Sequence, residues 1–131
     1  MPEYRKESEL SFENLCARVP EVVQKNGFAV LEEIRTSDIL KSKGFDYTNL
    51  RTYDICNAGY ANKALSFDSG VETIVPCHLI VKEAEGHTEV AVQMPREMFG
   101  SLHREKSEDM EGFLVEVEEK LKGIVEAIIK E

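Results

Sequence analysis

Tryptophan is absent from this sequence, and cysteine and proline are scarce, with three and four residues among 131. The cysteines Cys16, Cys56 and Cys77 are an odd number, are spaced 40 and 21 residues apart, and form no CxxC pair. A small secreted protein held by disulfides has an even set of cysteines at closer spacings. We therefore expect reduced thiols and a cytoplasmic location, in which a Cys56–Cys77 disulfide is disfavoured even if their strands are neighbours.

Basic residues are also few, because 16 Lys and Arg face 25 Asp and Glu, and the formal net charge is −9. Nucleic-acid binding depends on clustered Lys and Arg that neutralise phosphates. The densest basic stretch, residues 103–106, is interrupted by Glu105 and is typical of a solvated loop. The composition therefore predicts no nucleic-acid partner.

Long apolar runs are missing as well, since no window reaches the ~18 apolar residues of a membrane span. Residues 1–7 lack the apolar core of a signal peptide. We expect no membrane partner and a cytoplasmic protein. The length fits a single domain over residues 1–131.

Hydrophobic periodicity predicts an α+β fold. We expect a first helix between Ser11, an N-cap, and Gly27, with a kink or a break into two short helices at Pro20. Further helices are expected at 38–43, capped by Ser37, and from 58 to 65 or 67, capped by Asn57. Alternating or apolar runs predict strands at 3–9, 28–34, 50–56, 73–82 and 89–94.

The last helix has the strongest pattern. Ser107 is a suitable N-cap, and apolar residues then recur every three or four positions from Met110 to Ile128. Val115 and Ile129 widen the apolar stripe beyond the face that one sheet would cover. The width favours a second partner for this helix, and pairing with another copy of the chain is a common solution.

Residues 53–78 hold the candidate site, because two cysteines and one histidine lie there around a predicted strand-to-helix turn. Cys56 precedes a helix N-terminus, where the helix dipole can lower the pKa of a thiol. His78 is the nearest candidate base, and a tyrosine hydroxyl at a pocket mouth can orient a ligand. The candidate ligand-binding residues are Cys56, Asn57, Cys77, His78 and Tyr53.

Strand alternation argues against some of this chemistry. Cys77 shares the apolar face with Leu79, whereas His78 points to the opposite face. Cys56, Cys77, His78 and His87 match no zinc-ligand spacing, so we predict no metal site from them.

Residues 26–93 resemble the family called domain of unknown function 302. The matching motifs are Gly27-Phe28, Asp38-Ile39-Leu40, the strand and turn from Tyr53 to Asn57, Lys63-Ala64-Leu65, and Val75-Pro76-Cys77. The sequence departs from the family pattern at Ala58, where proline usually follows the asparagine. The resemblance implies a two-layer α/β domain around a mostly antiparallel sheet of about five strands, with helices on one face, commonly as a dimer. It implies no established activity.

Two functions are compatible with the sequence. The first is a small cytoplasmic homodimer that binds a small molecule in a cleft near Cys56 and Cys77, with thiol redox or sulfur chemistry as an extension. The second is a non-catalytic homodimeric interaction module that uses the amphipathic C-terminal helix. The sequence specifies neither a cofactor nor a reaction.

Overall fold

Five strands form one fully antiparallel sheet in the order β1-β5-β4-β3-β2 in the computed structural model, which describes residues 3–130. Hence β1 and β2 are the two edges. The part of residues 1–7 that precedes Glu3 lies outside the described residues. In chain order the elements are β1 (Glu3–Ser8), α1 (Phe12–Lys25), β2 (Ala29–Ile34), α2 (Thr36–Ser42), β3 (Leu50–Cys56), α3 (Ala58–Phe67), the 3₁₀ helix η1 (Ser69–Thr73), β4 (Cys77–Ala84), β5 (His87–Gln93), α4 (Pro95–Gly100) and α5 (Glu108–Ile129).

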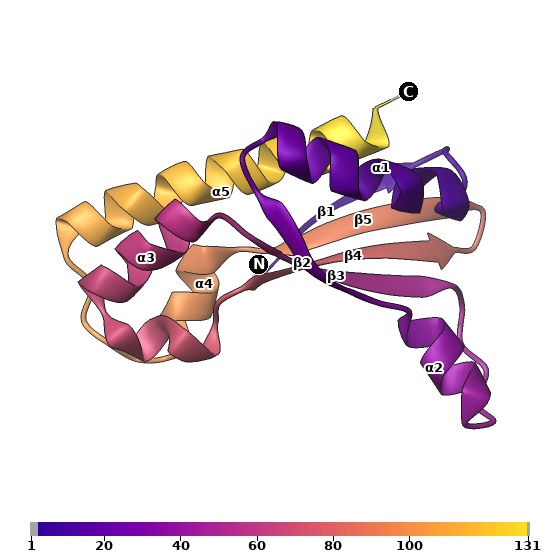
Figure 1. Cartoon of the computed structure of the whole chain (residues 1–131), viewed down its shortest axis with the longest axis horizontal. Helices are drawn as coiled ribbons and strands as arrows, with labels where there is room; N and C mark the ends of the chain where they lie inside the picture. Colours follow the sequence, from indigo (N-terminus) through magenta and orange to yellow (C-terminus); the bar gives the residue numbers. More distant parts are fainter. Residues whose placement is uncertain (1–2, 131) are drawn as a thin grey trace.

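Figure 1 shows α1 and α5 lying side by side over one face of this sheet, while α3 and α4 gather at one end of it. The predicted two-layer α+β architecture is therefore confirmed. Within residues 3–130, no helix is both long enough and apolar enough to cross a membrane.

The long helix α5 supplies a large part of the core. Ser107 caps it by accepting a hydrogen bond from the Met110 amide, as predicted. Its apolar stripe is buried against the sheet and α1, and each such side chain contributes about 1.5–3 kcal/mol by leaving water. The buried apolar residues of α5 are Met110, Phe113, Leu114, Val117, Leu121, Ile124, Val125 and Ile128.

Pro20 does not break the first helix, which corrects the sequence prediction: α1 is one helix from Phe12 to Lys25. Proline lacks the N–H that would bond the carbonyl four residues earlier. Here that carbonyl belongs to Cys16, and the Tyr53 hydroxyl donates to it over 3.3 Å from β3. A tertiary hydrogen bond therefore replaces the helical one.

Two other predicted boundaries were wrong. Ser37 does not cap α2, which begins at Thr36 after Arg35; its hydroxyl instead donates to the Leu50 carbonyl and accepts from the Leu50 amide. The fourth strand begins at Cys77, not at 73, because η1 and a cis Val75–Pro76 peptide occupy the preceding residues. The side chain of Ser37 thus fastens α2 to the start of β3.

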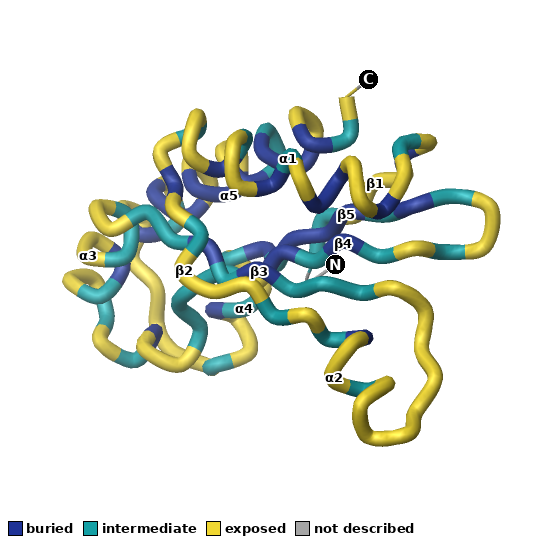
Figure 2. Tube along the Cα trace, turned by 45° about the vertical axis from the view of Figure 1, so that its right-hand side comes forward, coloured by how far each residue is buried: buried dark blue, intermediate teal, exposed yellow. Residues whose placement is uncertain are grey.

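The segment around α2 projects away from the hydrophobic core. In both views it projects from the far end of β3, on the side away from α1 and α5, and Figure 2 shows most of it as exposed. We call residues 31–47 the α2 arm. Four of its six large apolar side chains are at least half exposed, namely Leu31 56%, Ile39 52%, Phe45 64% and Tyr47 50%, and the other two, Ile34 and Leu40, are half-buried.

Candidate functional site

A mostly apolar cavity of about 60 Å³ lies where the ends of β3 and β4 meet α3, α4 and α5. It opens to solvent on one side. Both cysteines of the candidate site line it, together with aromatic and sulfur-containing side chains from the helices. We call it the thiol pocket, defined by Cys56, Tyr60, Cys77, Met98, Phe99 and Phe113.

Asn57 positions the wall that α3 forms. Its Oδ1 accepts the Tyr60 amide at 3.0 Å, which satisfies one of the free N–H groups at the start of α3. Its Nδ2 donates to the Gly27 carbonyl, also at 3.0 Å. Gly27 has φ +81°, a conformation that side chains rarely adopt, and this lets the chain leave α1 sharply enough to meet Asn57. Gly27, the predicted end of the first helix, and Asn57, the predicted cap of α3, are therefore joined by a hydrogen bond.

The loop that precedes β4 forms another wall of the thiol pocket. Val71 is buried, and Ile74 lines the cavity. Asp68 fixes this turn, because Oδ1 accepts the Gly70 amide at 2.8 Å and Oδ2 accepts Arg104 Nε at 2.6 Å. The Arg104 guanidinium and the Gly70 amide hold the pKa of Asp68 below its usual range. The basic stretch 103–106 is a loop, as predicted, and Arg104 supports the pocket from it.

Aromatic rings close the inner end of the thiol pocket. Tyr60 meets Phe28 and Phe113 edge to face, with ring centroids 5.9 and 5.7 Å apart. Phe113 also meets Phe67 at 5.7 Å. Such pairs add about 0.5–1.5 kcal/mol each beyond their buried area. The rings thus join α3 to α5 beside the cavity.

The two thiols are free, although β3 and β4 are neighbours and Ile55 lies opposite Cys77. Burial raises the pKa of Cys56, although it stands directly before α3 as predicted. Burial, with a smaller contribution from Cys56, raises the pKa of Cys77 to about 12. Both thiols are therefore protonated at neutral pH and behave as small polarisable apolar groups.

Two of the predicted site residues do not line the pocket. Tyr53 is 1% exposed, and its hydroxyl reaches α1 as described above. His78 lies on the opposite, open face of the sheet, where it pairs with Asp54 from the neighbouring strand. The pocket therefore unites Cys56, Asn57 and Cys77 and leaves out Tyr53 and His78.

The sequence analysis missed the residues that α4 and α5 contribute. Met98 and Phe99 come from α4, a short helix that begins at Pro95. Proline is favoured in the first turn of a helix, so Pro95 marked a helix start as well as the strand end that was predicted. Phe113 was recognised as core but not as a pocket wall.

None of the lining residues within 3–130 is Asp, Glu, Lys, Arg or His. The side chains in the lining that could transfer a proton are therefore Tyr60 and the two thiols. Gln93 lines the pocket, and its Oε1 accepts the His78 amide at 3.1 Å. The arrangement is suited to holding an apolar group, with amide and thiol groups as its polar contacts.

Comparison with known protein families and solved structures identifies what this chain is similar to. The family model described as Domain of unknown function DUF302 matches residues 4–128. The chain belongs to this family. Its solved structures include the crystal structure of an uncharacterized conserved DUF302 protein from Bacillus stearothermophilus, which is 21% identical and superimposes with a TM-score of 0.89 over 99% of each chain. That likeness extends the shared fold over nearly the whole chain. No curated protein matches the sequence.

Proposed function

We propose that this chain binds the apolar end of a small molecule in the thiol pocket. The observation that carries the proposal is a solvent-open cavity whose lining has no charged side chain and whose two thiols are kept protonated by burial. Exposed apolar concavities of this kind are the usual location of small-ligand sites. The raised thiol pKa values support binding rather than thiolate redox chemistry.

The size of the cavity limits the bound group. An apolar cavity of about 150 Å³ accepts benzene. The thiol pocket, at about 60 Å³, fits a group of a few carbon atoms, and a larger ligand would leave its remaining part outside. The ligand that fits best is therefore a short alkyl chain or similar group that carries a polar part at the pocket mouth.

A homologous series of primary alcohols tests this directly. Each methylene that enters an apolar site adds about 0.8 kcal/mol, which is about a fourfold gain in affinity. We expect the affinity, measured from amide chemical-shift titrations, to rise by about that factor per carbon and then to level off when the pocket is full.

A matched pair of variants provides the control. Ala61 lines the pocket on α3, so Ala61→Leu should fill it and abolish the rise in affinity. Ala127 is exposed on α5, and Ala127→Leu makes the same chemical change away from the pocket. Equal alcohol binding by both variants would contradict the proposal.

A second function, homodimerisation, is favoured by a different observation. The apolar stripe of α5 is largely buried within the chain's own core, and its Val115 is 38% exposed. Four apolar side chains of the α2 arm, Leu31, Ile39, Phe45 and Tyr47, are exposed further. The arm has four acidic and three basic residues, so its own charge is nearly balanced. Two arms therefore repel each other less than other surfaces of a chain whose net charge is −9. We propose a second copy of the chain as the partner of this arm.

Sedimentation of the full chain tests the dimer and locates it. Phe45→Ser removes the most exposed apolar side chain of the α2 arm and should shift a dimer toward monomer. Val115→Ser is the matched change on α5 and should leave the dimer intact. If Val115→Ser disrupts the dimer and Phe45→Ser does not, the interface lies on α5 and not on the α2 arm. A monomeric wild-type chain would refute dimerisation.

A further inference from the structure

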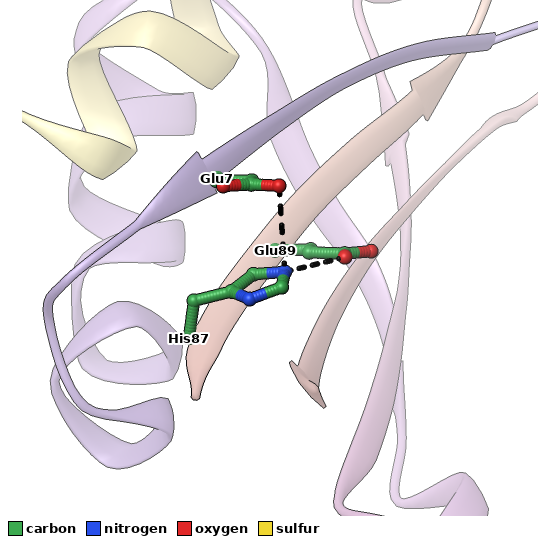
Figure 3. A group of neighbouring side chains, drawn as sticks. All are labelled: Glu7, His87 and Glu89. Atoms are coloured by element: carbon green, nitrogen blue, oxygen red, sulfur yellow. Dashed lines mark hydrogen bonds and ion pairs between the residues drawn. The ribbon is translucent and has the colours of Figure 1, made fainter. Parts of the chain in front are cut away.

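A second group of side chains lies at the other end of β5 from the thiol pocket. His87 begins this strand and Gln93 ends it, so the two sites are about 20 Å apart at the usual rise of a strand. His87 and Glu89 are two residues apart and share a face, and the register places Glu7 of β1 directly opposite Glu89. Figure 3 shows the three side chains converging on one point above the open face of the sheet.

Their ligand atoms lie close enough together for one small metal ion to reach all three. His87 Nε2 lies 2.8 Å from Glu89 Oε2 and 3.6 Å from Glu7 Oε1, and all three ligand atoms lie within 4.8 Å of one another. Tetrahedral Zn²⁺ with bonds of about 2.1 Å separates its ligand atoms by about 3.4 Å. An ion would therefore widen the His87–Glu89 separation by about 0.6 Å and break that hydrogen bond. Glu7 is exposed, so its side chain can adjust to the same ion.

Arg5 orients one of these ligands. Its Nη1 donates to Glu89 Oε1 at 2.6 Å, so the other carboxylate oxygen, Oε2, is directed at His87. Outer groups that fix a ligating carboxylate in this way are a regular part of metal sites. Glu7 and Glu89 oppose each other directly across the two strands, where like charges are destabilising, and the cationic partners beside them are Arg5 and His87.

We propose that Glu7, His87 and Glu89 bind one divalent transition-metal ion of the Zn²⁺ class. One imidazole and two carboxylates suit Zn²⁺ and its neighbours, whereas Mg²⁺ and Ca²⁺ prefer oxygen ligands alone. Water would fill the remaining coordination position on this exposed face. The ion would replace the histidine as the cation between the two carboxylates and join edge strand β1 to β5.

Calorimetric titration of the full chain with Zn²⁺ tests the site. We expect one ion per chain in wild type, at least a tenfold loss of affinity in Glu89→Gln, and no binding at this site in His87→Ala. His78→Ala is the matched control, because His78 is also exposed on the open face but has one carboxylate neighbour, Asp54; this variant should bind Zn²⁺ as wild type does.

Three results would overturn the proposal. Absence of saturable binding in the micromolar range would show that the group is a salt-bridge cluster only. Zn²⁺ binding unchanged in His87→Ala but lost in Cys56→Ser would place the ion on the thiols. Equal binding of Mg²⁺ and Zn²⁺ would show that the carboxylates act without the imidazole.

Discussion

Replacing Tyr53 with phenylalanine tests how the first helix tolerates its internal proline. The substitution removes the hydroxyl that donates to the Cys16 carbonyl but keeps the buried ring. A buried acceptor left without a donor costs about 1–3 kcal/mol. We therefore expect Tyr53→Phe to lower the free energy of unfolding by that amount, measured by urea denaturation followed by circular dichroism.

The double-mutant cycle with Pro20→Ala makes the test specific. Alanine at this position restores the amide that bonds Cys16 within the helix, so the carbonyl keeps a donor when the tyrosine hydroxyl is removed. Tyr53→Phe should then cost at least about 1 kcal/mol less in the Pro20→Ala background than in wild type, a coupling of the size that contacting residues show. An equal cost in both backgrounds would refute the proposed replacement of the helical hydrogen bond.

Three further predictions concern the thiol pocket. Phe113→Leu should lower the free energy of unfolding by about 1–2 kcal/mol through lost ring contacts. It should also enlarge the pocket, so that affinity levels off at an alcohol at least one carbon longer than in wild type. Phe12→Leu is the control, because Phe12 is equally buried but outside the pocket, and it should leave that chain length unchanged. The pocket thiols should react with iodoacetamide more slowly at pH 7 than a free thiol does, and their rate should still be rising above about pH 8.5, where that of a free thiol levels off. Fast reaction at neutral pH would contradict their raised pKa values. Asp68 has a lowered pKa in the folded chain, so its contribution to stability is present above about pH 4 and is lost as the pH falls through the folded pKa; denaturation at graded pH should show this loss in wild type and a weaker one in Arg104→Ala.

The sequence predicted those parts of the fold that depend on local patterns. Ser11, Asn57 and Ser107 cap helices where their short polar side chains and the following apolar spacing indicated. The strand predicted at 3–9 forms as β1, Glu3–Ser8, and its polar residues suit the sheet edge where it lies. Each of these features is decided by residues within one turn or one strand.

The errors came from contacts between residues far apart in the chain. Pro20 was expected to kink the helix or divide it in two, and the helix is not divided because a compensating hydroxyl comes from Tyr53, 33 positions later. Ser37 had the chemistry of a cap, but its hydroxyl is used by Leu50. Local rules identify groups that need a partner and do not say which partner the fold supplies.

The candidate site was predicted in part for the same reason. The structure brings Cys56, Asn57 and Cys77 together around one pocket because they lie at the adjoining ends of β3 and β4. Tyr53 and His78 are near them in sequence but do not line this pocket. The α4 wall, with Met98 and Phe99, lies beyond the stretch that the cysteines marked. The conjunction of Glu7 with His87 and Glu89 depends on β1 pairing with β5, which the sequence alone does not reveal.

A map of amide chemical-shift changes on adding 1-butanol to the full chain would show where the alcohol binds. We expect changes centred on Cys56, Ala61, Cys77 and Phe99, with none at His87, and their loss in Ala61→Leu. Changes centred on the α2 arm, or changes that persist in Ala61→Leu, would contradict the assignment of the thiol pocket as a ligand site.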